Sequence, residues 1–151
     1  MKILFLCTAN SCRSILSEAL FNHLAPAGVR AYSAGSEPKG FVHPLTLEAL
    51  ERAGVACDGL LSKPIEAHAE LQPDVVITVC DKAAGEACPV FFGSALRAHW
   101  GLADPSEVSG SEAEIAAAFD ATVARIKTRI QAFLALDSAA LRAELARIGS
   151  L

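Results

Sequence analysis

A cysteine, an arginine and a serine stand close together near the N-terminus, in the stretch FLCTANSCRSILSEAL of residues 5–20. Cys7 ends a short apolar run, and Arg13 and Ser14 come just before an amphipathic segment. A thiolate is a strong nucleophile, and the planar guanidinium of arginine matches a tetrahedral oxyanion. The spacing therefore predicts attack by Cys7 on an oxyanion that Arg13 holds.

The residues between Cys7 and the amphipathic segment form the expected oxyanion-binding loop: Thr8, Ala9, Asn10, Ser11, Cys12 and Arg13. In open α/β sheets, ligands bind beyond the carboxyl ends of the strands. Backbone N–H groups at a helix N-terminus favour an anion there and lower the pKa of a thiol. Asn10 tolerates the left-handed conformation that such a loop needs. We therefore expect the pKa of Cys7 to lie well below that of a free thiol.

Short apolar segments and amphipathic segments alternate along the chain, which predicts the elements that position this loop. Strands are expected at 2–6, 29–35 and 74–80, with a weaker one within 95–100; helices are expected at 14–25, 43–54, 115–133 and 138–148. Strands separated by helices indicate βαβ units, and hence a parallel sheet with helices on both faces. The polar stretch 105–111 is too short to link two domains.

Composition excludes several classes of protein. The chain has 151 residues, of which 52% are hydrophobic and 20% charged, which indicates a folded domain rather than a disordered chain. A net charge of −4 argues against a nucleic-acid or membrane-surface partner, which would need a basic face. The apolar runs fall short of a membrane span, and MKILFL is too short for the core of a signal peptide. We expect a cytoplasmic monomer.

Five cysteines are present: Cys7, Cys12, Cys57, Cys80 and Cys88. There is no CxxC pair, and the spacing to histidine does not suit a structural zinc site. Cys80 ends the expected strand 74–80, at the same sheet edge as Cys7 if the two strands are parallel. Cys88 follows after the seven residues DKAAGEA at 81–87. We interpret Cys57 as a core residue and take Cys80 and Cys88 as candidate redox partners of Cys7.

Four motifs carry a resemblance to a known family: CTANSCRS at 7–14, YSAGS at 32–36, DVVITVC at 74–80 and HWGLADPS at 99–106. They resemble the arsenate reductases built on the low-molecular-weight protein tyrosine phosphatase fold. The similarity extends over residues 1–135 and implies a four-stranded parallel sheet flanked by helices on both faces. Residues 136–151 are expected to be a C-terminal helical extension of the same domain.

The resemblance also implies roles for individual residues. Cys7 would be the nucleophile, Arg13 would hold the oxyanion, and Ser14 would donate a hydrogen bond to the thiolate. Asp104, in the Asp-Pro pair, would be the general acid, and Asp81 is its rival. His99 and Trp100 are given no role.

Arsenate reduction and phosphate ester hydrolysis both begin with thiolate attack, and only the later steps separate them. A phosphatase needs no second thiol, whereas reduction of arsenate takes two electrons, which Cys80 and Cys88 could supply. Tyrosine phosphatases of this fold carry tyrosines just after the Asp-Pro pair, where this chain has Ser106 and Glu107. We therefore expect thiol-dependent reduction of arsenate to arsenite through an intramolecular disulfide relay. The alternatives are a phosphatase and a non-catalytic oxyanion-binding or redox-sensing module.

Partners and cofactors follow from the same resemblance. Phosphate or sulfate should compete with arsenate, and no tightly bound cofactor is expected. Because Cys80 and Cys88 lie slightly farther apart than in the thioredoxin-coupled members, the reductant could be thioredoxin or glutathione with glutaredoxin. In some arsenate reductases of this fold a potassium ion sits beside the loop, and Asn10, Glu18 and Ser33 align with its ligands, so these three residues are a candidate potassium site.

Overall fold

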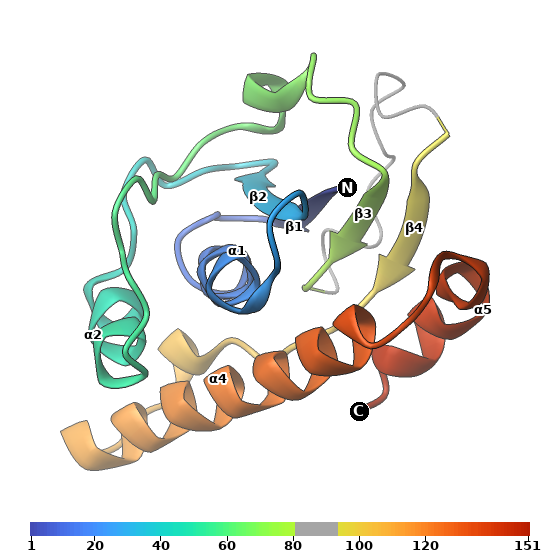
Figure 1. Ribbon diagram of the computed structural model, residues 1–151. Helices are drawn as coiled ribbons and strands as arrows, with labels where there is room; N and C mark the ends of the chain where they lie inside the picture. Colours follow the sequence, from blue (N-terminus) through green and yellow to red (C-terminus); the bar gives the residue numbers. More distant parts are fainter. Residues whose placement is uncertain (81–93) are drawn as a thin grey trace.

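A computed structural model describes residues 1–80 and 94–151 of the chain (Figure 1). Its strands are β1 (Lys2–Cys7), β2 (Arg30–Gly35), β3 (Val75–Thr78) and β4 (Leu96–His99). Its α-helices are α1 (Arg13–Leu24), α2 (Pro44–Arg52), α4 (Glu112–Leu134) and α5 (Ser138–Ile148), and its short 3₁₀ helices are η1 (Ile65–His68) and η3 (Pro105–Glu107). The expected order of strands and helices is confirmed.

The four strands form one sheet in the order β2-β1-β3-β4. Each neighbouring pair is parallel, and Ile3 in the centre of the sheet pairs with both Ala31 and Val75. The expected four-stranded parallel sheet is therefore confirmed. Because the strands are parallel, the ends of β1 and β3 meet at one edge of the sheet, and Cys7 pairs there with Gly35.

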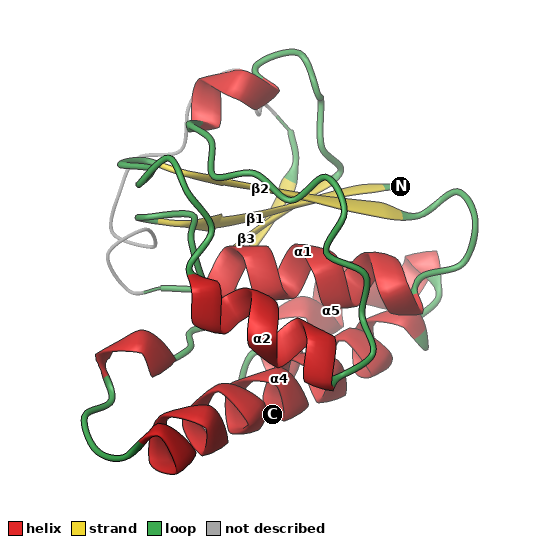
Figure 2. Cartoon of the chain, turned by 90° about the vertical axis from the view of Figure 1, so that its left-hand side faces the viewer, coloured by secondary structure: helices red, strands yellow, loops and turns green. Residues whose placement is uncertain are grey.

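The two faces of the sheet are covered differently. Figure 2 shows α1, α2, α4 and α5 on one face and η1 on the other, so within the described residues α-helices cover one face and the expected helical cover of the second face is the short 3₁₀ helix η1. Side chains of β1 alternate between the faces, as a strand requires. Phe5 belongs to the large core under the helices, whereas Leu4 and Leu6 belong to a smaller core with Val76 that Ile65 of η1 helps to cover.

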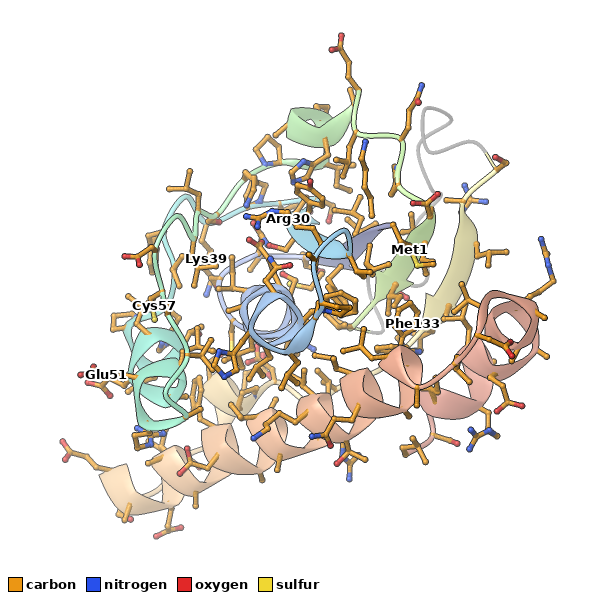
Figure 3. All side chains as sticks on the ribbon, in the orientation of Figure 1. Met1, Arg30, Lys39, Glu51, Cys57 and Phe133 are labelled. Carbon is orange, nitrogen blue, oxygen red and sulfur yellow. The ribbon has the colours of Figure 1, made fainter. Side chains whose placement is uncertain are left out.

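Aromatic rings fill the large core between the sheet and the helices. Phe5 lies 6.1 Å from Phe21 of α1 and 6.1 Å from Trp100, measured between ring centroids. Phe133 of α4 points toward the sheet (Figure 3) and lies 6.0 Å from Trp100. The long helix thereby packs across α1 and the end of β4.

Local capping explains where the last two helices begin. Ser111 caps α4 by accepting the N–H of Glu114 at 3.1 Å, and its hydroxyl donates to the carboxylate of Glu114. This N-cap starts the helix one turn before the apolar pattern that predicted it. Asp137 caps α5 in the same way, through the N–H of Ala140.

The C-terminal helix packs on the rest of the domain. Leu141, Leu145 and Ile148 of α5 are buried in the large core, and the helix contacts β4 and α4. Within residues 1–80 and 94–151, no helix has both the length and the apolar character that crossing a bilayer requires.

Candidate active site

The loop of residues 8–12 connects the end of β1 to the start of α1, where the sequence places the oxyanion site. Asn10 adopts the left-handed conformation, with φ of 47°. Gly35, at the end of β2, lets the loop pass close by, because a Cβ there would lie 2.4 Å from the carbonyl oxygen of Thr8. Glycine is thus required at this close approach. The sequence motif YSAGS contains Gly35, but nothing in the sequence alone indicated this role.

Backbone hydrogen bonds fix the shape of the loop. The carbonyls of Thr8 and Ala9 accept the N–H groups of Glu37 and Lys39, at 2.9 and 3.0 Å. The carbonyl of Ser11 accepts the N–H of His43 at 2.9 Å and the hydroxyl of Thr46 at 3.1 Å. The loop carbonyls thus point toward the segment 37–46, which donates hydrogen bonds to them. The N–H groups of such a loop are then available to bind an anion.

Cys7 is buried at the base of the loop, with 3% of its surface exposed. Its sulfur lies 3.1 Å from the hydroxyl of Ser14 and accepts the N–H of Asn10 at 3.3 Å. Both interactions lower the pKa of Cys7, but a hydrogen bond with the Cys80 side chain raises it more strongly, and burial raises it further. The net effect is a raised pKa, so the expectation of an acidic Cys7 is wrong for this geometry. The expectation rested on the loop dipoles, whereas the hydrogen bond with Cys80, which the sequence places only at the same sheet edge, decides the direction of the shift in the pKa of Cys7.

Cys80 reaches the loop from the end of β3, 73 positions from Cys7 in the sequence (80 − 7). Besides its interaction with Cys7, its sulfur lies 3.5 Å from the hydroxyl of Thr8. Cys7 and Cys80 are both free thiols and both buried. The structure thus brings together the first two cysteines of the expected relay. Cys88 and Asp81 lie outside the described residues.

The other two described cysteines are Cys12, in the loop itself, and Cys57. Burial raises the pKa of Cys12 to about 11. Cys57 is only half-buried, and its sulfur lies near the carbonyls of Leu47 and Val55, at 3.9 and 3.7 Å. It packs against the large core, in line with the structural role that the sequence suggested.

Arg13 and Asp104 face each other at the mouth of the loop. One terminal nitrogen of Arg13 donates to the carbonyl of Leu102 at 3.0 Å, and the other lies 3.6 Å from the carboxylate of Asp104. Asp104 is 22% exposed and caps η3, accepting the N–H of Ser106 at 2.9 Å and its hydroxyl at 2.6 Å. In the sequence, Ser106 stands out only as the residue in place of a tyrosine, and nothing there indicates this contact, which holds the carboxylate in place.

A chain of hydrogen bonds runs from Cys7 to Glu18. The side-chain N–H₂ of Asn10 donates to Ser14 at 2.8 Å and to Ser33 at 3.0 Å, and Ser33 donates to Glu18 at 2.5 Å. The side-chain oxygen of Asn10 accepts the N–H of Lys63 at 2.8 Å. The three residues of the candidate potassium site are therefore together, but the amide that faces Ser33 offers hydrogens rather than an oxygen.

Lys63 brings a positive charge to the same place. Its ammonium lies 3.9 Å from the carboxylate of Glu18, with 22% of the Lys63 side chain exposed. Burial lowers the pKa of Lys63, and Glu18 acts in the opposite direction. A potassium ion needs oxygen ligands, so a resident ammonium and an amide N–H₂ do not fit it. Among the described residues, no three His, Cys, Asp or Glu side chains are grouped to hold a metal ion.

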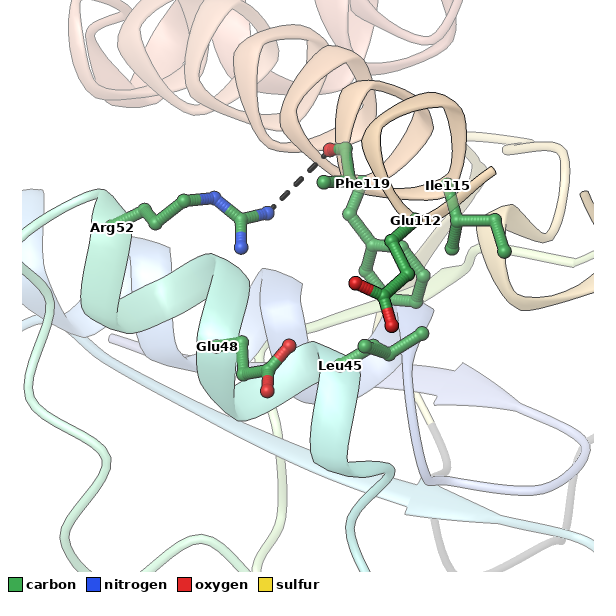
Figure 4. Close-up of a pocket in the computed structure, with 7 residues that line it drawn as sticks. Leu45, Glu48, Arg52, Glu112, Ile115 and Phe119 are labelled. Atoms are coloured by element: carbon green, nitrogen blue, oxygen red, sulfur yellow. Dashed lines mark hydrogen bonds between the residues drawn. The ribbon is translucent and has the colours of Figure 1, made fainter. Parts of the chain in front are cut away.

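A cavity of about 340 Å³ lies between α2 and α4 (Figure 4). Arg52 donates across it to the carbonyl of Ala116 at 3.5 Å. Its walls also include the carboxylates of Glu48 and Glu112, which would repel an oxyanion. None of its lining residues belongs to the loop after β1, so the loop and not this cavity is the candidate oxyanion site.

The comparison with protein families agrees with this geometry. The family described as "Low molecular weight phosphotyrosine protein phosphatase" matches residues 2–147. The chain belongs to this family. Within it, the chain is 34% identical over 131 residues to an arsenate reductase of Bacillus subtilis (strain 168), covering 87% of this chain and 93% of that protein. It is 36% identical over 110 residues to an arsenate reductase of Staphylococcus xylosus, covering 73% and 82% of the two chains.

Solved structures described as arsenate reductases share the fold. A structure described as an arsenate reductase in the phosphate binding state superposes with a TM-score of 0.73 and 29% identity, covering 89% of this chain and 96% of that one. A thioredoxin-dependent arsenate reductase of Corynebacterium glutamicum superposes with a TM-score of 0.62 and 31% identity, covering 87% of this chain and 62% of that one. The expected resemblance and fold are confirmed.

Proposed function

We propose that this protein reduces arsenate to arsenite with electrons from its own cysteines. The observation that carries the proposal is the contact between the thiols of Cys7 and Cys80 beside the loop. Ester hydrolysis by a member of this family needs a single thiol, whereas reduction of As(V) to As(III) needs two. The names of the relatives from B. subtilis and S. xylosus support the same activity.

The first step forms a bond between Cys7 and arsenic. Arsenate binds in the loop, held by the backbone N–H groups and by Arg13, which turns from Leu102 and Asp104 to the anion. The Cys7 sulfur attacks the arsenic and an oxygen departs, leaving as water after Asp104 protonates it. Because the pKa of Cys7 is raised, its thiol proton must also be lost, and an oxygen of the bound dianion can accept it.

The second step transfers the electrons. The Cys80 thiol gives its proton to an oxygen of the arsenic group and its sulfur attacks the Cys7 sulfur, so the pair of electrons of the sulfur–arsenic bond goes to arsenic. Arsenite leaves, and Cys7 and Cys80 are oxidised to a disulfide. Two thiols thus supply the two electrons that the reduction requires, and no cofactor takes part.

A third cysteine and an external thiol restore the enzyme. We propose that Cys88 attacks Cys80 and carries the disulfide outward for reduction by a protein or glutathione. The similarity to a thioredoxin-dependent arsenate reductase favours thioredoxin as the external reductant, rather than glutathione with glutaredoxin. Thiol reductants of this kind act in the cytoplasm, where we place the reaction, with phosphate or sulfate as competing anions. We propose that the protein acts as a monomer.

The positive charge beside Glu18 comes from Lys63 rather than from potassium in this proposal. The ammonium of Lys63 balances Glu18, and Glu18 in turn fixes Ser33 and Asn10. The asparagine then presents its N–H₂ group to Ser14, which lies against the nucleophile.

The test is arsenite production by the reduced protein with either thioredoxin and its reductase or glutathione and glutaredoxin as the electron source. We expect arsenate-dependent oxidation of the reductant, abolished by Cys7→Ser, with oxyanion binding retained. Slow hydrolysis of a phosphate ester alone would not distinguish the functions, since the loop chemistry is shared. Ester hydrolysis without arsenite formation under either reductant would make the protein a phosphatase. If the protein shows neither arsenite formation nor ester hydrolysis, it is a binding or sensing module.

A further inference from the structure

The segment that leads to Asp104 is held by two arginines. Arg13 donates to the carbonyl of Leu102 at 3.0 Å. Arg129, on α4, donates from one terminal nitrogen to the carbonyls of Trp100 and Gly101, at 2.9 and 3.1 Å. Three successive carbonyls, of residues 100–102, therefore bind guanidinium groups just before the proposed acid.

Arg129 is an unusual residue for the core of a domain. It is 3% exposed, and its Nε is buried without a hydrogen-bond partner. No carboxylate of residues 1–80 or 94–151 forms an ion pair with it. Burying a charge without a counter-ion is costly, and among residues 1–80 and 94–151 the groups that compensate it are backbone carbonyls. An apolar side chain would fill this part of α4 at lower cost, so the arginine points to a task beyond packing.

The end of α5 braces the same segment from the other side. The second terminal nitrogen of Arg129 donates to the carbonyl of Gly149 at 2.9 Å. The indole N–H of Trp100 donates to the carbonyl of Leu145 at 2.9 Å. A Cβ on Gly149 would lie 2.5 Å from the carbonyl oxygen of His99, so the chain end packs directly on the end of β4. Figure 1 shows α5 beside β4, with the C-terminus under α4.

Arg13 cannot hold this segment throughout the reaction. Its two terminal nitrogens are engaged by Leu102 and by Asp104. A tetrahedral oxyanion is bound by the same planar fork of donors. When Arg13 turns to the substrate, its contacts with Leu102 and Asp104 are lost at the moment when the acid must be in place.

We propose that Arg129, braced by the end of α5, is a positioning residue that keeps Asp104 aligned on the leaving oxygen after Arg13 has turned to the substrate. Arg129 touches neither the substrate nor Asp104; it acts through the carbonyls of Trp100 and Gly101. The inference rests on the proposed role of Asp104 as the general acid, which both arsenate reduction and ester hydrolysis would use.

The test compares Arg129→Met with Arg125→Met, an exposed arginine one turn earlier on the same helix. The chemical step is followed by single-turnover arsenite formation, and anion affinity by phosphate competition. Because proton donation by a positioned acid contributes typically about 10²–10⁴-fold, we expect Arg129→Met to lose about tenfold or more of that rate. Phosphate affinity should stay near that of the parent, because the loop and Arg13 are intact. Arg129→Lys, which keeps a donor, should recover part of the rate.

A double variant separates positioning from general damage to the fold. In an Asp104→Asn background there is no acid left to align, so adding Arg129→Met should cost little further rate. The same loss of rate in both backgrounds, or equal behaviour of Arg129→Met and Arg125→Met, would overturn the inference. If Arg129→Met does not fold, Trp100→Phe removes the bond to Leu145 instead and should show the same dependence on Asp104. If the protein reduces no arsenate, the same variants are compared in p-nitrophenyl phosphate hydrolysis. The role of Arg129 is then tested independently of the proposed arsenate reduction.

Discussion

Replacing Ser14 by alanine should weaken the nucleophile by a calculable amount. The Ser14 hydroxyl lies 3.1 Å from the Cys7 sulfur and is the largest of the contributions that lower the pKa of Cys7. A hydrogen bond to a charged group contributes about 1.5–3 kcal/mol. Because one pKa unit corresponds to about 1.4 kcal/mol, the pKa of Cys7 should rise by about one to two units. At a pH below that pKa, the thiolate fraction falls about 10- to 100-fold, and the rate of arsenite formation should fall with it.

The assay pairs two measurements with a matched control. The pH dependence of Cys7 alkylation, read by peptide mapping, reports the thiol pKa, and single-turnover arsenite formation reports the chemistry. Ser17→Ala is the control, because Ser17 is a buried serine one turn further along α1 whose hydroxyl donates to the backbone carbonyl of Arg13. Thermal unfolding checks that both variants fold. If Ser14→Ala and Ser17→Ala gave the same alkylation profile and the same rate, the hydroxyl would not act on the nucleophile.

Three further predictions follow from the contacts of the site. Asp104→Asn should lose about 10²–10⁴-fold in rate, while Asp120→Asn on the exposed face of α4 should not; a large loss from Asp81→Asn with little from Asp104→Asn would reverse the assignment of the acid. Cys80→Ala removes the largest contribution that raises the pKa of Cys7, so half-maximal alkylation of Cys7 should move to lower pH; a profile identical to that of Cys57→Ala would show that Cys80 does not act on Cys7. Exchanging sodium for potassium salts should leave the rate unchanged because Lys63 occupies the cation position, and stimulation by potassium would contradict this.

The sheet and the loop could be predicted because their signals are local. The apolar runs, the Cys-x5-Arg spacing and the helix-forming segments each stand within a short stretch of sequence. The element boundaries differ from the prediction: β3 spans Val75–Thr78 rather than 74–80, and α4 begins at Glu112 rather than 115 because of the cap at Ser111.

The features that the sequence did not reveal depend on contacts between distant segments. The raised pKa of Cys7 comes from Cys80, and the sequence alone does not state how closely the ends of two parallel strands approach. Lys63 lies in a stretch without periodicity, and only its approach to Glu18 indicates a role. In the sequence, Arg129 occupies what looks like an ordinary polar position of an amphipathic helix. Only the structure shows that it donates to the carbonyls of residues 100, 101 and 149.

The central claim is that Cys7 and Cys80 together deliver the electrons to arsenic, and single-turnover disulfide mapping tests it most directly. Fully reduced Cys88→Ser is mixed with arsenate without an external reductant, and arsenite and disulfide-linked peptides are measured. The account predicts a single equivalent of arsenite per protein and a trapped Cys7–Cys80 disulfide, whereas Cys80→Ser should release none. Arsenite release from Cys80→Ser at the parent rate, or a disulfide that joins Cys7 to any residue other than Cys80, would contradict it.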